Sequence, residues 1–76
     1  MTEFLLYGTE ACHLCEQAEQ LLSDVGLKFT KLDIMDDDKA QQLYALRIPV
    51  LRHQSGLELN WPFDDQQLRD FILERN

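Results

Sequence analysis

The apolar positions of the chain change their spacing within the first 26 residues. Residues 4–7 (FLLY) form an unbroken apolar run that Gly8 ends, which is typical of a strand buried on both faces. From residue 14 the apolar positions follow the spacing of one helix face: Leu14, Ala18, Leu21, Leu22 and Val25. Gly26 then stands where a left-handed residue commonly ends a helix. The pattern therefore predicts a strand followed by a helix whose apolar stripe runs from Leu14 to Val25.

A second strand and a second helix are predicted next. Residues 27–34 have the composition of a strand, although their apolar and polar positions do not alternate strictly. We expect an edge strand with Lys28 and Lys31 facing water, because charged side chains on an edge discourage pairing with other chains. Asp36 is predicted to cap the helix that follows. That helix is expected to turn three side chains inward: Ala40, Leu43 and Tyr44.

A hairpin and a last helix complete the pattern. Residues 48–51 begin a third strand, residues 55–56 (SG) form a turn, and residues 57–59 form a fourth strand. Asp64, with Gln67 three residues later, resembles a capping box. The helix behind this box is expected to bury Leu68, Phe71 and Ile72.

The predicted order of elements is β-α-β-α-β-β-α, in a single domain that spans residues 1–76. The first β-α-β unit is expected to be parallel and right-handed, and the hairpin adds antiparallel strands. The fold class is therefore α/β, with a four-stranded mixed sheet and helices on both faces. A chain of this length has room for one thin core, since it buries only about 60 % of its unfolded surface.

The net charge of −7 excludes one class of partner. Nucleic acid is not expected, because phosphate contacts need clustered Lys and Arg, and the seven basic residues here are scattered. No membrane span is expected, because no apolar run approaches roughly 18 residues.

The first ten residues contain Glu3 and no basic segment, so they are not predicted to be a secretory signal. Two cysteines are too few for a secreted disulfide framework, so a cytoplasmic location is expected.

Both cysteines lie in residues 8–16 (GTEACHLCE), where the first strand passes into the first helix. Cys12 is predicted at the start of the helix and Cys15 in its first turn, so their sulfurs are near enough to form a disulfide. Backbone N–H groups at a helix start lower the pKa of a thiol below its usual value of about 8.5. We therefore predict that Cys12 attacks a partner disulfide and that Cys15 resolves the mixed disulfide.

Metal binding by these residues is a weaker interpretation. A C-x-x-C pair also fits half of a zinc site, but the only histidines are His13 and His53, and His13 lies inside the motif with poor geometry. The three aspartates at 36–38 are interpreted as a helix start rather than a cation site. His13 itself either supports the thiolate when protonated or is an exposed residue without a role.

Ile48-Pro49 is a second unusual feature, because proline seldom begins an interior strand. One interpretation is an ordinary trans peptide bond. The other is a cis bond near Cys12, which would expose the main chain of Ile48 for pairing with an extended substrate.

Several pieces of sequence resemble the thioredoxin superfamily and, within it, the small glutaredoxin-like proteins. The matching pieces are Tyr7-Gly8 before the cysteines, Ile48-Pro49-Val50, residues 55–59 (SGLEL), and Asp64-Asp65 with Leu68. The resemblance extends over essentially the whole chain. It implies a thioredoxin/glutaredoxin-like fold, a nucleophilic Cys12, a resolving Cys15, and a substrate groove formed by Ile48, Pro49 and the start of the last helix.

Three positions depart from the glutaredoxin pattern. His13-Leu14 stand where Pro-Tyr is usual, Thr9 replaces a basic residue that meets a glutathione carboxylate, and Trp61-Pro62 replace a Gly-Gly pair. Asp64 still matches the position that receives the glutathione amino group, and Arg47 is a candidate partner for a carboxylate. Disulfide exchange is therefore expected, whereas glutathione binding is expected to be weakened.

The sequence supports one leading hypothesis and two alternatives. The leading one is a monomeric glutaredoxin-like enzyme that exchanges electrons between its Cys-x-x-Cys dithiol and protein or glutathione mixed disulfides. It has no bound cofactor, and glutathione or a reductase supplies the electrons. The first alternative is a non-catalytic thioredoxin-fold module that binds or senses with little glutathione recognition. The second is a form in which Cys12 ligates an iron–sulfur centre shared between two chains.

Overall fold

Four strands form one mixed sheet in the computed structural model, which describes residues 3–74. The strands are β1 (Phe4–Gly8), β2 (Thr30–Asp33), β3 (Val50–His53) and β4 (Glu58–Asn60). They lie in the order β2-β1-β3-β4. β1 pairs in parallel with β2 and antiparallel with β3, and β3 pairs antiparallel with β4. The predicted parallel unit and the predicted hairpin are thus both present.

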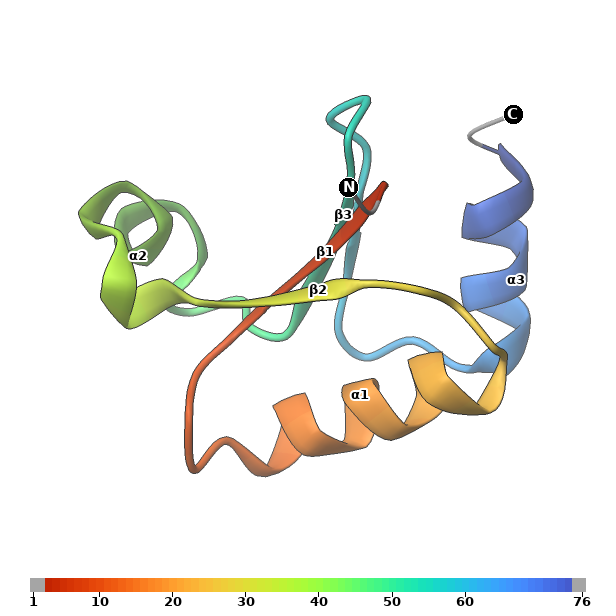
Figure 1. The fold of residues 1–76 in the computed structure, drawn as a ribbon, viewed down its shortest axis with the longest axis horizontal. Coiled ribbons are helices and arrows are strands. Elements are labelled where there is room, and N and C mark those ends of the chain that lie inside the picture. Colours follow the sequence, from red (N-terminus) through yellow and green to blue (C-terminus); the bar gives the residue numbers. More distant parts are fainter. Residues whose placement is uncertain (1–2, 75–76) are drawn as a thin grey trace.

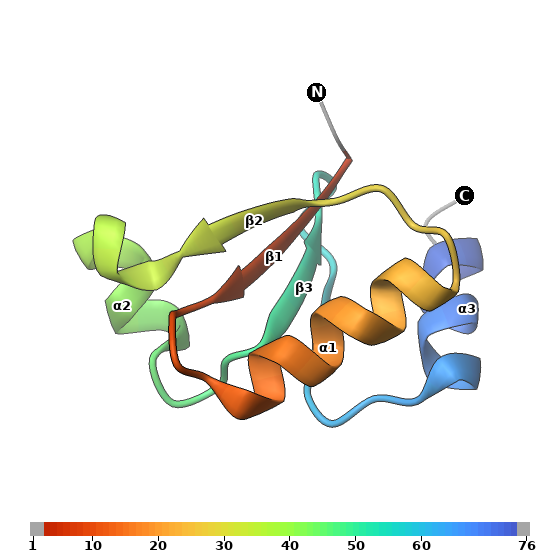
Figure 2. The ribbon, with the colours of Figure 1, turned by 60° about the horizontal axis from the view of Figure 1, so that its bottom comes forward.

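Helices cover both faces of this sheet, as Figures 1 and 2 show. The helices are α1 (His13–Asp24), α2 (Asp38–Tyr44) and α3 (Asp65–Glu74), and a short 3-10 turn, η1 (Ile34–Asp36), precedes α2. Side chains of α1 and α3 pack on one face, whereas side chains of α2 and η1 pack on the other. This arrangement confirms the predicted α/β fold class.

The larger core lies between the sheet and the two helices α1 and α3. Leu22 of α1, Leu51 of β3 and Leu68 of α3 are completely buried there. Each such side chain contributes roughly 1.5–3 kcal/mol of transfer free energy on burial. Trp61 is partly buried against the same core and meets Phe63 edge-on, with 5.0 Å between ring centroids. The tryptophan therefore helps to cover the core, as large aromatic residues commonly do in small domains.

A polar network ties α2 to β4 on the other face. The Tyr44 hydroxyl donates a hydrogen bond of 2.6 Å to Glu58, and Arg47 pairs with the other Glu58 oxygen at 2.9 Å. Tyr44 also stacks on Tyr7, with 4.5 Å between ring centroids. Burial, followed by the bond to Glu58, raises the pKa of Tyr44. The same hydrogen bond is the main reason why the pKa of Glu58 is lowered.

Two signals predicted from the sequence are present at helix ends, one at the end of α1 and one at the start of α3. Gly26 follows α1 with a φ of 77°, a left-handed value that glycine adopts without steric cost. At α3, the backbone N–H of Gln67 donates to the Asp64 side chain at 2.7 Å. The backbone N–H of Asp64 donates in return to the Gln67 side chain at 2.9 Å. The predicted capping box is thereby confirmed, and it satisfies two N–H groups at the start of α3.

Several sequence predictions about boundaries and inward faces were wrong. Asp36 does not cap α2, because it ends η1 and Asp37 accepts the capping bond from the N–H of Lys39. Leu43 is 53 % exposed, because α2 has seven residues and turns Ala40 and Tyr44 toward the sheet. These two residues are four positions apart and so share one helix face.

Two further differences concern the start of α1 and the second strand. Leu14 is 46 % exposed, because Cys15 occupies the inward position in the first turn. β2 begins at Thr30 rather than at residue 27, and residues 27–29 precede it as a loop. Lys28 and Lys31 face water as expected for an edge. Among residues 3–74, no helix combines the length and apolar character needed to cross a membrane.

Candidate redox site

The two cysteines lie at the junction of β1 and α1 and form a disulfide. Cys12 is the N-cap residue of α1, and its sulfur accepts the backbone N–H of Cys15 at 3.2 Å. The two Cα atoms are 5.2 Å apart, which lies within the range of ordinary disulfides. The predicted meeting of the two sulfurs at a helix start is therefore observed in the structure.

The two sulfurs differ in their access to solvent. Cys12 is half-buried, whereas Cys15 is only 3 % exposed. A helix start carries N–H groups without intrahelical partners and a partial positive charge. One of these N–H groups already points at the sulfur of Cys12. Cys12 is thus the more accessible of the two cysteines, and its sulfur lies at the positively polarised start of α1.

Gly8 lets strand β1 pass directly beneath the inner cysteine. A Cβ atom placed on Gly8 would lie 3.0 Å from the Cys15 sulfur and 3.3 Å from the Cys15 Cβ. Favourable contacts between such atoms need about 3.5–4.0 Å. The sequence predicts Gly8 as a strand end and as part of the glutaredoxin-like pattern, but no local pattern shows that the Cys15 side chain rests on its backbone. The turn between Gly8 and Cys12 also holds Ala11 at a φ of 58°, which is uncommon for a residue with a Cβ.

The Ile48-Pro49 segment lies at the same end of the sheet as the disulfide. Val50, the next residue, pairs with Tyr7 of β1, and Figure 2 shows the chain before β3 passing close to the start of α1. The Ile48–Pro49 peptide bond is cis. Pro49 is buried and Ile48 is partly exposed, so a role of this pair in substrate contact remains a prediction. The Trp61–Pro62 bond is also cis, which the sequence interpretation did not anticipate.

The structure also shows where three other residues singled out in the sequence lie: Asp64, Arg47 and His13. Figures 1 and 2 place the start of α3, which Asp64 caps, toward the far end of α1 from the cysteines. Its predicted role in substrate binding stays a prediction. Arg47 is engaged by Glu58, and its guanidinium lies 4.9 Å from the centre of the Tyr44 ring. His13 is exposed and lies 3.5 Å from Glu16.

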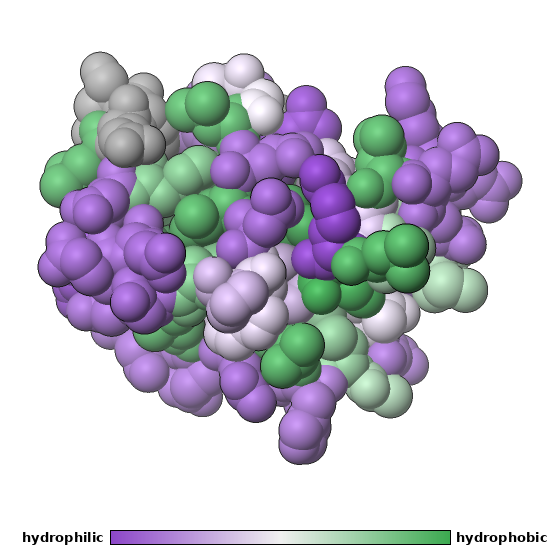
Figure 3. Space-filling model, turned by 180° about the vertical axis from the view of Figure 1, so that it is seen from behind, coloured by the Kyte–Doolittle hydropathy of each residue, from purple (hydrophilic) through white to green (hydrophobic). Residues whose placement is uncertain are grey.

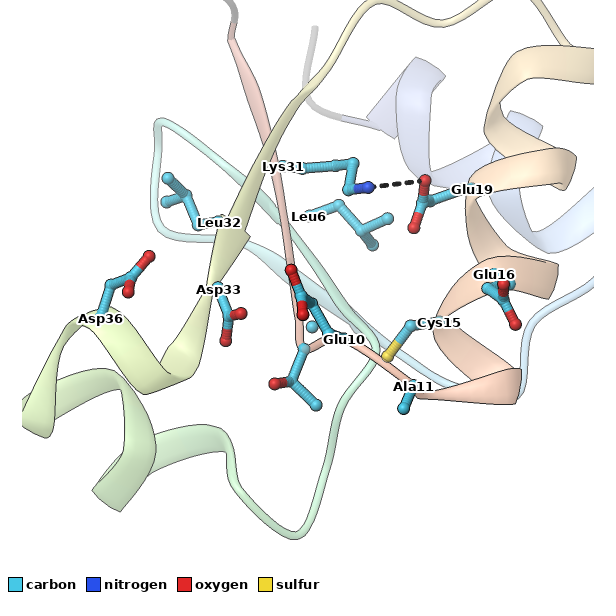
Figure 4. Close-up of a pocket in the computed structure, with 12 residues that line it drawn as sticks. Leu6, Glu10, Ala11, Cys15, Glu16, Glu19, Lys31, Leu32, Asp33 and Asp36 are labelled. Atoms are coloured by element: carbon cyan, nitrogen blue, oxygen red, sulfur yellow. Dashed lines mark ion pairs between the residues drawn. The ribbon is translucent and has the colours of Figure 1, made fainter.

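A cavity of about 500 Å³ opens beside Cys15, between α1 and the edge strand β2. Figure 4 shows the carboxylates of Asp33 and Asp36 across the cavity from the Cys15 sulfur, with Glu10 between them. The charged residues of the lining are Glu10, Glu16, Glu19, Lys31, Asp33 and Asp36. The single cation, Lys31, is paired with Glu19 at 3.2 Å. The sequence interpretation missed this cavity, because its walls come from segments that are far apart in the chain.

Among residues 3–74, no three side chains of His, Cys, Asp or Glu come together in a way that would hold a metal ion. The sulfurs of Cys12 and Cys15 can alternate between a dithiol and a disulfide.

Comparison with solved structures gives close structural relatives. The X-ray structure of protein XcR50 from X. campestris is 40 % identical in sequence, with a TM-score of 0.87 over 93 % of this chain and 96 % of that chain. The solution structure of protein Ne2328 from Nitrosomonas europaea is 25 % identical, with a TM-score of 0.78 over 92 % and 89 % of the two chains. No curated protein matches the sequence.

A glutaredoxin from Archaeoglobus fulgidus shares the fold at 19 % identity, with a TM-score of 0.69 over 95 % of this chain and 87 % of that chain. The family model that matches is described as "Glutaredoxin-like domain (DUF836)", and it covers residues 3–73. Since this match spans almost all of the described chain and includes the strand–helix junction with its two cysteines, the chain belongs to the glutaredoxin-like domain family.

Proposed function

We propose that this protein is a small thiol–disulfide oxidoreductase that works in the cytoplasm on protein disulfides. The observation that carries the proposal is the asymmetric pair at the start of α1. Cys12 is partly exposed and its sulfur accepts an N–H bond, whereas Cys15 is buried within bonding distance. Reactive cysteines of this class sit in accessible places where the thiolate is stabilised.

The reaction proceeds in two exchanges that conserve atoms and electrons. In the first, the Cys12 thiolate attacks one sulfur of the partner disulfide, the partner S–S bond breaks, and the leaving thiolate takes a proton from solvent. In the second, Cys15 loses its proton and attacks the Cys12 sulfur, which releases the second partner thiol. The partner gains two electrons, and the protein keeps the disulfide. Either glutathione or a reductase then supplies two electrons and returns the protein to the dithiol state.

Glutathione is a weaker candidate for tight binding than a protein partner. Arg47, the cation nearest to the cis-proline segment in sequence, already forms an ion pair with Glu58. Thr9 and Trp61-Pro62 occupy positions where the glutaredoxin pattern has glutathione contacts. Losing one hydrogen bond to a charged group costs about 1.5–3 kcal/mol, or about ten- to a hundredfold in affinity.

Two matched cysteine variants test the proposal. Reduced wild-type protein, Cys12→Ser and Cys15→Ser are each mixed with a peptide disulfide, and released peptide thiol is followed over time. We expect rapid release by the wild type and none by Cys12→Ser. Cys15→Ser should stop at a mixed disulfide through Cys12, which mass spectrometry detects as the protein plus one peptide.

The non-catalytic alternative gives a different result in the same experiment. A module that only binds or senses would form its disulfide with a general oxidant but would not reduce the peptide at a useful rate. Full peptide reduction by Cys12→Ser, or a mixed disulfide through Cys15 in the wild type, would contradict the assigned roles of the sulfurs.

A further inference from the structure

We propose that the partner disulfide carries positive charge beside its reacting cysteine, in the form of Lys or Arg residues on the same protein segment. This inference rests on the proposed function and adds the class of substrate to it. The observation behind this inference is the cavity of about 500 Å³ whose lining includes Cys15.

The cavity lies next to the residue to which a substrate chain would be joined. Ala11, which forms part of its lining, is the residue immediately before Cys12. A partner joined to Cys12 by a mixed disulfide extends by about 3.3–3.6 Å per residue. One or two residues next to the partner's cysteine therefore reach the cavity mouth. The side chains of those residues are the ones that the cavity can select.

The lining of the cavity is strongly acidic. Its five carboxylates face a single ammonium group, that of Lys31, which Glu19 already neutralises. Glu10 and Asp36 are exposed, and neither forms an ion pair within residues 3–74. Clefts lined by one sign of charge concentrate ligands of the opposite sign and raise their association rates by about 10- to 1,000-fold. A cationic partner is thus favoured and an anionic thiol is disfavoured.

Among the described residues, the face of the molecule shown in Figure 3 carries no single broad apolar surface. On the face shown in Figure 3, apolar side chains reach the surface in separate small groups with hydrophilic side chains between them. On the cis-proline side, Arg47 is held by Glu58. Charge complementarity at the cavity is the recognition feature next to the disulfide on which this proposal rests.

The test compares three peptide disulfides of equal length, whose cysteines are flanked by two Lys, two Glu or two Ser residues. Second-order rate constants with the reduced protein are measured at about 20 mM and about 500 mM salt. We expect the Lys peptide to react at least about tenfold faster than the Glu peptide at low salt, with a smaller ratio at high salt.

Two matched double variants test whether the charges at the cavity cause the difference in rate between the Lys and Glu peptides. Glu10→Gln with Asp36→Asn removes two charges at the cavity. Asp24→Asn with Asp70→Asn removes two exposed charges elsewhere, each of which accepts a bond from a neighbouring Gln that Asn can also accept. Both variants have the same net charge. We expect the Lys-to-Glu rate ratio to fall about threefold or more in the cavity variant and to change less than twofold in the control.

The outcomes separate this inference from the proposed function. If all three peptides react at equal rates, or if the control variant lowers the ratio as much as the cavity variant, the cationic partner is ruled out while the exchange reaction stands. If none of the peptides reacts, the proposed function fails and the partner inference fails with it.

Discussion

Replacing Gly8 by Ala tests whether strand β1 holds the inner sulfur in place. The new Cβ would lie 3.0 Å from the Cys15 sulfur, and Cys15 is only 3 % exposed. Gly8 has no left-handed φ, so alanine fits the backbone there without strain. Any cost of the change therefore comes from the contact with Cys15.

The expected cost follows from two opposing effects. Overpacking of this kind costs about 1–3 kcal/mol, because the side chain or the backbone must shift. Exchanging glycine for alanine also restricts the unfolded chain, which stabilises the folded protein by about 0.4–1 kcal/mol. We expect a net destabilisation of about 1–2 kcal/mol in the reduced protein.

The assay is a double-mutant cycle under reducing conditions. Free energies of unfolding are measured by urea denaturation for wild type, Gly8→Ala, Cys15→Ala and the double variant. In Cys15→Ala the sulfur is gone, and the nearest atom to the new Cβ becomes the one at 3.3 Å. We expect Gly8→Ala to be nearly neutral in that background, with a coupling energy of about 1 kcal/mol.

The redox equilibrium supplies a second readout, because the disulfide fixes the Cys15 sulfur more firmly than a thiol does. Gly8→Ala should make the reduction potential less negative, by about 20 mV for each 1 kcal/mol of extra cost in the oxidised state. An equal loss of stability with and without the Cys15 sulfur would refute this reasoning. So would an unchanged potential.

The remaining predictions concern stability. Glu58→Gln should cost about 1–2 kcal/mol at pH 7, because Glu58 accepts charge-assisted bonds from Tyr44 and Arg47. Since folding lowers the pKa of Glu58, its contribution is present above about pH 4.3 and is lost as the pH falls through the folded-state value, so the difference between the variant and the wild type in urea denaturation should shrink steadily as the pH is lowered below about 4.3. Asp64→Ala should cost about 1 kcal/mol by loss of the helix cap, and Asp64→Asn should restore most of it in the same assay. Leu51→Ala in the core should cost about 2–5 kcal/mol, whereas Leu46→Ala at a fully exposed position should change the unfolding free energy by less than about 0.5 kcal/mol.

Local signals in the sequence were enough for the order of the elements and for the two cysteines. The capping box at Asp64, the left-handed Gly26 and the placement of Cys12 before a helical stripe all depend on residues within a few positions of one another. Such signals are readable because backbone geometry and hydrogen bonding act over one turn of chain. The same reasoning failed for Leu43 and Leu14, whose exposure depends on where the short helix and the helix start meet the sheet.

The tertiary structure alone decided which distant groups surround the sulfurs. The contact of Gly8 with Cys15, the union of Glu10 with Asp36 in one cavity, and the pairing of Arg47 with Glu58 each join segments that no local pattern connects. Contacts of this kind arise when the whole chain packs, because the position of each partner depends on the core between them. The amino-acid sequence by itself therefore determined the reactive pair and its helix, whereas the packed fold determined what can approach that pair.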